Sequence, residues 1–269
     1  MGNTSSSLHG DVQKTLGVKL AAIYNMFDGE ELLIGSMRCL KDSVDLFIIV
    51  HQNISNFGEQ YDPLKYLPVA EMDAEFPIRW VYYEPGITGM MDEKMKRNYG
   101  INVAKHFGCT HFILMDCDEY YMPGDFEKGK QLFLASGKDG SVVSLFTYFK
   151  SAELRQEILD SYYVPFIHEL KPYTVTGNTT YPMYVDPTRR VNSEYAWQLP
   201  VIMHHYSWVR RDIHRKARNS SAKKNIEKSS LMQDWETAVE GSIVNGGNKL
   251  IKVPDYFGVN QMIRTLESV

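Results

Sequence analysis

Cysteine, long apolar runs and a charged leader are all scarce or absent in this sequence. The three cysteines, Cys39, Cys109 and Cys117, lack the CxxC spacing of zinc sites, and each stands beside apolar residues. They predict reduced thiols in a cytoplasmic protein, with neither a disulfide framework nor a zinc site. Apolar runs such as 46–50 are far too short to cross a bilayer, and no charged segment followed by an apolar one opens the chain. We therefore expect a soluble, cytoplasmic protein.

An excess of positive charge and the common nucleotide-binding motifs are also missing. The net charge of −4 argues against non-specific wrapping of nucleic acid, so nucleic acid is not an expected partner. There is no glycine-rich dinucleotide fingerprint, no Walker loop, no internal repeat and no low-complexity block. What remains is a chain of 269 residues with 43% hydrophobic residues, enough for one large domain with a full core.

Strands and helices alternate in the first part of the chain. Apolar runs predict strands at 18–25, 44–50, 78–83 and 111–115. Acids in a first turn and apolar residues at helical spacing predict helices at 28–40 and 91–107. This order predicts an α/β fold with a Rossmann-like, mostly parallel central sheet, right-handed crossovers and flanking helices. The ligand crevice of such a sheet lies at the carboxyl edge of its strands.

The rest of the chain is predicted to complete a single domain. We expect helices at 126–136 and 152–161, strands at 141–149, 163–168 and 201–209, and a basic helix at 210–228. The turn-rich, aromatic stretch 171–195 is typical of a surface that frames a ligand. The predicted organisation is a flexible tail over 1–17, one domain over 18–219, and a helical extension over 220–269 packed on that domain.

The chain is organised around residues 111–121, HFILMDCDEYY, where an apolar run ends abruptly in acids. A buried parallel strand stays apolar until it leaves the sheet, so this pattern predicts carboxylates at a strand end. Side chains alternate along an extended segment, which points Asp116 and Asp118 the same way and Cys117 back into the protein. Two unpaired carboxylates repel each other, and oxygen ligands of this kind suit Mg²⁺ or Mn²⁺. An acid-x-acid triplet is also common in ordinary surface loops.

Basic and imidazole side chains from two other segments favour a diphosphate ligand. Arg97 precedes the acids on the predicted helix, and His204 and His205 occupy a late strand followed by the basic stretch that holds Arg210 and Lys216. A cation could bridge two phosphate oxygens, an arginine could grip them with a bidentate fork, and a neutral imidazole could complete the metal's ligands. Only one of the two adjacent histidines can face such a site from a strand. A solvated helix face and a contact to a membrane surface are the other interpretations of the basic stretch.

These motifs resemble the metal-dependent nucleotide-sugar glycosyltransferases of the GT-A fold, near the group with a family 2-like pattern. The resemblance covers residues 18–219. It rests on the first strand ending in Tyr24-Asn25, on Arg97-Asn98-Tyr99-Gly100, on Asp116-Cys117-Asp118 and on His204-His205. The chain departs from the family at His51-Gln52-Asn53, where members often carry an acid pair after the second strand.

The resemblance implies a division of roles around the donor. It implies that Asp118 binds Mn²⁺ or Mg²⁺, that Asp116 contacts the ribose or the metal, and that one of His204 and His205 reaches the cation. It implies a nucleotide-binding set consisting of Tyr24, Asn25, Gln52, Asn53, Arg97, Asn98 and Asp116. The basic stretch adds Arg210 and Lys216 as phosphate or membrane-surface contacts. The donor would be a nucleotide-diphosphate sugar of UDP or GDP type, with UDP favoured and a hexosyl group transferred.

The sequence indicates the acceptor and the catalytic base less specifically than the donor site. The expected acceptor is a glycan, a lipid-linked glycan or another hydroxyl compound, and an inverting enzyme would need a carboxylate base to take its proton. Glu153, Glu169 and Asp186 are the candidates, because all three follow the acids and lie in or beside the aromatic stretch. Peripheral membrane association is a further expectation, from the basic stretch and from an N-terminal pattern around Gly2 that fits acylation.

Other classes of protein fit these motifs less well. A haloacid-dehalogenase-type phosphatase places a small residue two positions after its second aspartate, where this chain has Tyr120. A calcium-binding module would need further oxygen ligands in register and a following glycine. A metal-dependent phosphohydrolase, a non-catalytic carbohydrate-binding protein and a transferase acting on nucleic-acid bases remain as alternatives.

Overall fold

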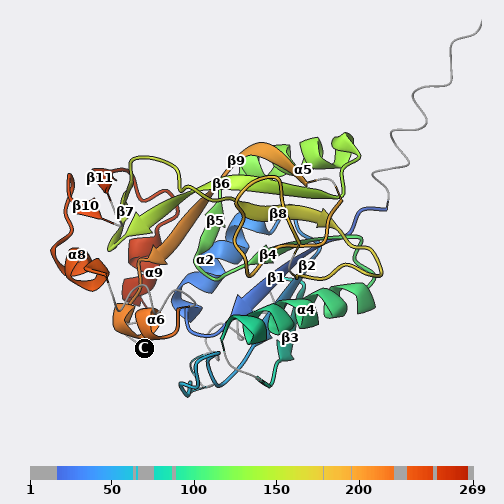
Figure 1. Ribbon diagram of the computed structural model, residues 1–269, viewed down its shortest axis with the longest axis horizontal. Coiled ribbons are helices and arrows are strands. Elements are labelled where there is room, and N and C mark those ends of the chain that lie inside the picture. The colour runs from blue at the N-terminus through green and yellow to red at the C-terminus, as the bar shows by residue number, and fades with distance from the viewer. Residues whose placement is uncertain are drawn as a thin grey trace, which may run out of the picture.

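The chain forms a mixed eleven-stranded sheet with helices packed against it, as the computed structural model shows (Figure 1). The structure describes residues 17–62, 65, 76–86, 89–177, 179–194, 196–220, 229–244 and 247–265. Along the sheet the strand order is β10-β11-β7-β6-β8-β4-β1-β2-β3, while β9 pairs with β6 and carries β5. The predicted α/β fold, a central sheet flanked by helices, is confirmed. The predicted tail over 1–17 falls almost entirely outside the described residues.

The amino-terminal half is the predicted parallel sheet. Its strands are β1 (Leu20–Met26), β2 (Leu46–His51), β3 (Ile78–Tyr82) and β4 (His111–Met115). β1 pairs in parallel with both β2 and β4, and β2 pairs in parallel with β3. The strands β1, β2 and β4 are buried along almost their whole length, as continuous apolar runs require when both faces of a sheet are covered. All four strands therefore end at the same edge.

Helices cover this half of the sheet from both sides. α4 (Met90–His106) packs on β1 and β2, and Gly100 allows the close approach because its missing Cβ would collide with Ile23 and Val50. α2 (Glu30–Leu40) packs against α9 (Val259–Thr265) and β5 (Glu119–Tyr121). α5 (Pro123–Ser136) packs against β9 (Ala196–Trp208) and ends in a left-handed Gly137. The predicted helices at 28–40, 91–107 and 126–136 are thus confirmed.

The carboxy-terminal half is largely antiparallel. β6 (Gly140–Phe149) pairs antiparallel with β7 (Ser151–Gln156) and β8 (Val164–Glu169), and parallel with β9. The helix predicted at 152–161 is wrong, because residues 152–156 belong to β7 and residues 157–161 begin the connection to β8. Its residues favour helix intrinsically, but pairing with β6 on one side and β11 (Asn248–Lys252) on the other outweighs that preference.

The end of the chain mixes helix and strand. The predicted basic helix at 210–228 is described only as α6 (Ile213–Arg218), and residues 221–228 lie outside the described part. The extension over 220–269, predicted to be helical, contains α8 (Leu231–Thr237) and α9 but also β10 (Ile243–Val244) and β11. β11 joins the main sheet through β7, so this segment completes the sheet. Among the described helices, none is both long and apolar enough to cross a membrane.

Candidate active site

A cavity of about 670 Å³ opens where β1 and β4 end and where β6 and β9 run past them. Seven residues predicted for the site line it: Asn25, Asp116, Asp118, Asp186, His205, Arg210 and Lys216. Residues not predicted for the site also line it, among them Asp28, Glu93, Thr147, Gln156, Asp160, Tyr162, Arg189, Trp208 and Asn248. The sheet edge predicted from the strand order is therefore where the structure places the cavity.

Asp116 is held by two arginines at the end of β4. Arg97 Nη2 on α4 donates to Asp116 Oδ1 at 3.0 Å, and Arg189 Nη2 donates to Asp116 Oδ2 at 2.7 Å. Burial alone would raise the pKa of Asp116, but Arg189 and Arg97 outweigh burial and hold this pKa below its ordinary value. Asp116 is thus a charged carboxylate whose two oxygens are already engaged.

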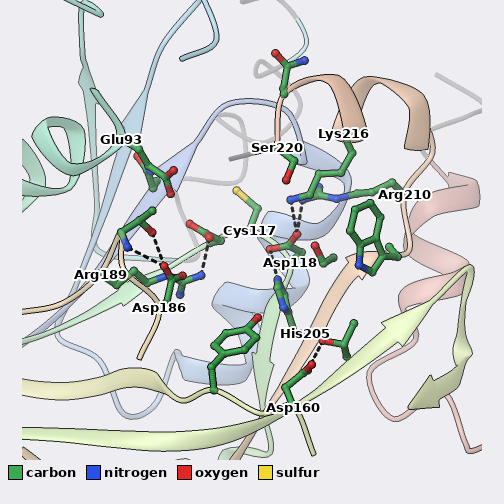
Figure 2. A pocket seen from close by; sticks show the side chains of 18 of the residues that line it. Glu93, Cys117, Asp118, Asp160, Asp186, Arg189, His205, Arg210, Lys216 and Ser220 are labelled. Carbon is green, nitrogen blue, oxygen red and sulfur yellow. Dashed lines mark hydrogen bonds and ion pairs between the residues drawn. The ribbon is translucent and has the colours of Figure 1, made fainter. Parts of the chain in front are cut away.

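Asp118 meets a second group of cations. Its Oδ2 accepts from Arg210 Nη2 at 2.6 Å and from Lys216 Nζ at 3.1 Å, and the side chain is fully buried (Figure 2). Burial opposes ionisation, yet Lys216 and Arg210 lower the pKa of Asp118 well below its usual range. Its Oδ1 makes no hydrogen bond within the described part of the chain, and His205 Nε2 lies 3.7 Å from it. Asp118 therefore presents one buried oxygen that is available to a ligand.

The strand register decides which histidine faces the cavity. His205 lies opposite Glu119 of β5 and Thr147 of β6, while His204 lies opposite Tyr120 and Phe146. Paired residues share a face of the sheet, so the two histidines point to opposite sides. His204 Nδ1 is 2.7 Å from the Tyr148 hydroxyl in an aromatic cluster, and burial lowers its pKa to about 4. The structure brings His205, but not His204, to Asp118.

Arg189 is the main site residue that sequence reasoning missed. Its guanidinium lies 2.5 Å from Glu119 Oε1 and 3.2 Å from Asp186 Oδ2, in addition to its bond to Asp116. Burial raises the pKa of Glu119 to about 7 in spite of this arginine. The sequence pointed only to the region of Arg189, the 171–195 stretch predicted to frame a ligand, and not to this residue. Its pairing with Asp116, 73 residues upstream, has no local signature.

The residues implied for nucleotide binding divide into two sets. Asn25 lines the cavity, and its Oδ1 has no hydrogen-bond partner among the described residues. Tyr24, Gln52, Asn53 and Asn98 are not part of the lining. The Tyr24 hydroxyl lies 2.8 Å from Ser36 Oγ in the core, Gln52 donates to Asn56, and Asn98 exchanges hydrogen bonds with Thr176. Arg97 stands behind Asp116, bonded to it and to Glu93.

The three base candidates lie in different places. Asp186 lines the cavity, paired with Arg189 and accepting from Thr188 at 2.8 Å. Glu153 is exposed on β7 and is not part of the lining. Glu169 ends β8 opposite His111, which begins β4, so it lies at the other edge of the sheet from Asp116. The structure therefore brings only Asp186 of the three to the site.

A second acidic group, with Asp28 in the cavity lining, stands at the start of α2. Asp28, Glu30 and Glu31 hold carboxylate oxygens within 4.8 Å of one another, and within the described ranges this is the one group of three or more His, Cys, Asp or Glu ligand atoms so close together. Arg211 pairs with Glu30 at 2.9 Å. Arg210 packs on the backbone here, because a Cβ at Gly29, whose φ is +120°, would collide with its guanidinium. The group is thus bordered by arginines.

Lys96 is a buried lysine beside the site, and its lowered pKa predicts a pH dependence of stability. Its side chain is 1% exposed, its ammonium donates to the Met26 carbonyl, and burial lowers its pKa from 10.5 to about 7. Above pH 7 the folded protein has lost this proton while the unfolded chain keeps it up to pH 10.5, so stability rises with pH in this window.

We predict that Lys96→Met removes this rise, which for one group amounts to at most about 1.4 kcal/mol per pH unit. Urea unfolding of wild type and variant at pH 7, 8 and 9 measures the difference. Lys41→Met, at an exposed position after α2, is the matched control. A variant whose stability follows pH as steeply as wild type would contradict the prediction.

Comparisons with known proteins give low similarity throughout. No family model matches the chain, and no curated protein matches it. A structure of S. aureus TarS 1–349 is 9% identical, covering 82% of this chain and 75% of that chain with a TM-score of 0.46. TarS 1–349 in complex with UDP-GlcNAc is 11% identical, covering 48% of this chain and 35% of that one with a TM-score of 0.37.

Two further structures show the same level of likeness. Mannose-1-phosphate geranyltransferase from Thermus thermophilus is 13% identical over 58% of this chain and 51% of that chain, with a TM-score of 0.33. Against another S. aureus TarS structure, at 12% identity and a TM-score of 0.38, the match spans 48% of this chain and 22% of that chain. Likeness at this level carries no functional inference, and the proposed function depends on the site alone.

Proposed function

We propose that the chain is a glycosyltransferase that takes a hexosyl group from a nucleotide-diphosphate sugar, with UDP favoured, and transfers it to a hydroxyl acceptor. One observation carries the proposal: Asp116 and Asp118 leave β4 into a cavity where Arg189, Arg210 and Lys216 converge on them. Carboxylates and cations that converge at a strand end suit a diphosphate, which needs positive charge on its oxygens.

Lys216 and Arg210 can bind a diphosphate without moving out of the cavity. Lys216 is 26% exposed and has rotatable donors, so it can turn from Asp118 to a phosphate oxygen in the same cavity. Arg210 is 6% exposed and keeps its bond to Asp118, which holds its guanidinium at the cavity wall. As the glycosidic bond breaks, charge develops on the departing diphosphate, and donors already placed there stabilise it. Removing one such donor typically costs about 3 kcal/mol of transition-state stabilisation.

A divalent cation fits one part of this arrangement. Asp118 Oδ1 is buried without a hydrogen bond in the described part, and His205 Nε2 is its neighbour at 3.7 Å. An oxygen and a neutral imidazole suit Mn²⁺ or Mg²⁺, the former more readily because of the nitrogen ligand. Asp118 and His205 would hold the ion, which would add positive charge at the diphosphate. Asp116, with both oxygens on arginines, is better placed to orient Arg97 and Arg189.

Donor binding tests the proposal. We expect UDP, or GDP if the base preference differs, to raise the thermal stability of the protein in the presence of Mn²⁺. A ligand that binds only the folded state at a hundred times its Kd adds about 2.7 kcal/mol, which shifts the melting temperature visibly. Lys216→Gln is expected to weaken this binding about tenfold, the loss of roughly 1.4 kcal/mol for one charge-assisted hydrogen bond.

A control variant and three contrary results separate the parts of this proposal. Arg218→Gln changes an exposed arginine on the same helix, paired with Glu59 at 3.3 Å, and should bind nucleotide like wild type. Stabilisation by UDP that is independent of Mn²⁺ would overturn the metal prediction and leave the transferase in place. No stabilisation by any of UDP, GDP, CMP, dTDP and their sugars would overturn the transferase itself. Turnover of a sugar phosphate instead would favour the phosphohydrolase alternative.

A further inference from the structure

The cavity continues beyond Asp118 and His205 to a wall built by β6, β7 and the segment after β7. Thr147 of β6 lies next to His205 in the sheet register and faces the same side. Gln156 ends β7, and Asp160 follows it in the connection to β8. Asp160 lies across His205 from Lys216 in the view of Figure 2. This wall carries no side chain that the diphosphate site uses.

Asp160 differs from every other acid in the cavity. The five others, Asp28, Glu93, Asp116, Asp118 and Asp186, each pair with an arginine or lysine at 3.9 Å or less. Asp160 has no such ion pair among the described residues. A lysine or arginine bound to a carboxylate makes it a poorer proton acceptor, and Asp160 is not subject to this effect within the described structure. Burial raises the pKa of Asp28 to about 6, but Arg210 and Arg215 oppose that shift.

The carboxylate of Asp160 is nevertheless held in place. Thr147 Oγ1 donates to its Oδ2 at 2.5 Å, and its backbone N–H donates to the Leu145 carbonyl at 3.0 Å. Burial raises its pKa, with the Thr147 hydrogen bond and then His205 opposing that shift. Its Oδ1 remains for a ligand, because Thr147 is the one side chain of the described residues that hydrogen-bonds this carboxylate. An oriented carboxylate with one free oxygen has the geometry of a general base.

Gln156 supplies an independent observation on the same wall. Its side chain is 2% exposed and lines the cavity, yet its Oε1 has no hydrogen-bond partner in the described structure. Leaving a buried polar atom unsatisfied costs about 1–3 kcal/mol, so such an atom indicates a missing partner. The half-buried Trp208 and the amide of Asn248 line the cavity with it. A cavity lined by an aromatic residue and two residues with side-chain amides suits a carbohydrate, which offers both apolar faces and hydroxyl groups.

We propose that this wall is the acceptor subsite, that Asp160 is the general base for the acceptor hydroxyl, and that Gln156 accepts from a neighbouring hydroxyl of a carbohydrate acceptor. The inference rests on the proposed glycosyl transfer. The acceptor oxygen forms a bond to the anomeric carbon while the bond from that carbon to the diphosphate breaks, and the electron pair leaves with the diphosphate. The proton of the acceptor hydroxyl passes to Asp160, and the anomeric configuration is inverted.

Donor hydrolysis tests the base without a known acceptor, because water is then the hydroxyl that must lose a proton. With UDP-glucose and UDP-N-acetylglucosamine, Asp160→Asn is expected to lower kcat for UDP release by about 10²–10⁴-fold, the usual contribution of a general base. UDP binding, measured by titration calorimetry, should stay within about twofold, since this wall is separate from the diphosphate cations. Asp42→Asn, an exposed aspartate after α2, is the matched control.

The outcomes separate the two proposals. Wild-type protein that binds no nucleotide overturns the transferase, and the base assignment with it. Normal UDP binding with undiminished hydrolysis in Asp160→Asn overturns the base alone. A retained anomeric configuration in the released sugar, observed by proton NMR, also overturns it.

Simple glycosides test the class of acceptor. We expect one or more of methyl glucoside, galactoside and mannoside to accelerate UDP release by wild type by transfer, and Gln156→Met to reduce that acceleration. Disaccharide product, detected by mass spectrometry, identifies transfer. Acceleration that is equal in Gln156→Met overturns the role of Gln156, and no acceleration by any glycoside overturns the carbohydrate class.

Discussion

Asp118→Ala is expected to lower the free energy of unfolding by about 3 kcal/mol and to abolish donor turnover. The fully buried carboxylate is the shared partner of Arg210 and Lys216, and removing one member of a buried ion pair typically costs about 3–5 kcal/mol because a charge stays behind without its partner. We take the lower end because Lys216 is 26% exposed and can reach water. Urea unfolding at pH 7 measures the stability, and UDP release measures the turnover.

The pH dependence of this loss follows from the pKa of Asp118. Because the folded-state pKa lies well below 3.8, the carboxylate stabilises the protein fully above that pH and loses its contribution as the pH falls through the folded value. The difference between wild type and Asp118→Ala should therefore be complete at pH 7 and shrink in acid. The double variant Asp118→Ala/Lys216→Met should recover part of the loss, since it also removes a stranded charge. A single-variant loss below about 1 kcal/mol would contradict the role of a buried ion cluster.

Arg189→Met is expected to lower the free energy of unfolding by about 3–5 kcal/mol at neutral pH. One guanidinium, 4% exposed, contacts Asp116, Glu119 and Asp186 at 2.7, 2.5 and 3.2 Å. Without it, Asp116 keeps Arg97, but Glu119 and Asp186 lose their cation among the described residues. Arg190→Met, which changes the adjacent arginine that donates to the Val185 carbonyl, is the matched control and should cost far less.

The loss in Arg189→Met should grow with pH. Glu119 has a folded-state pKa of about 7 against an ordinary 4.5, so the folded protein holds this proton where the unfolded chain has released it, and stability from this group falls as pH rises between those values. Without Arg189, the pKa of Glu119 rises further, and the fall extends to higher pH. Unfolding at pH 5 and pH 8 should show the larger difference from wild type at pH 8. An equal loss of unfolding free energy at pH 5 and pH 8 would mean that Arg189 does not affect the pKa of Glu119.

The local pattern of residues accounts for most of the first half of the fold. Apolar runs buried on both faces need no partner-specific information to predict strands, and β1, β2 and β4 lie where those runs are. The helix predicted over 152–161 was wrong because here the local preference and the tertiary pairing disagree. Its amino acids favour a helix locally, and only pairing with β6 and β11 makes residues 152–156 part of a strand.

The sequence by itself determined that two carboxylates stand at the end of a buried strand and that the preceding helix carries an arginine, because strand and helix periodicities are local. Only the tertiary structure decided that Arg189, Arg210 and Lys216 converge on Asp116 and Asp118, that His205 rather than His204 faces them, and that Asp160 stands apart from the cations. Those arrangements depend on strand register and on contacts between residues 73 to 98 positions apart in the chain, for which neighbouring residues carry no signal.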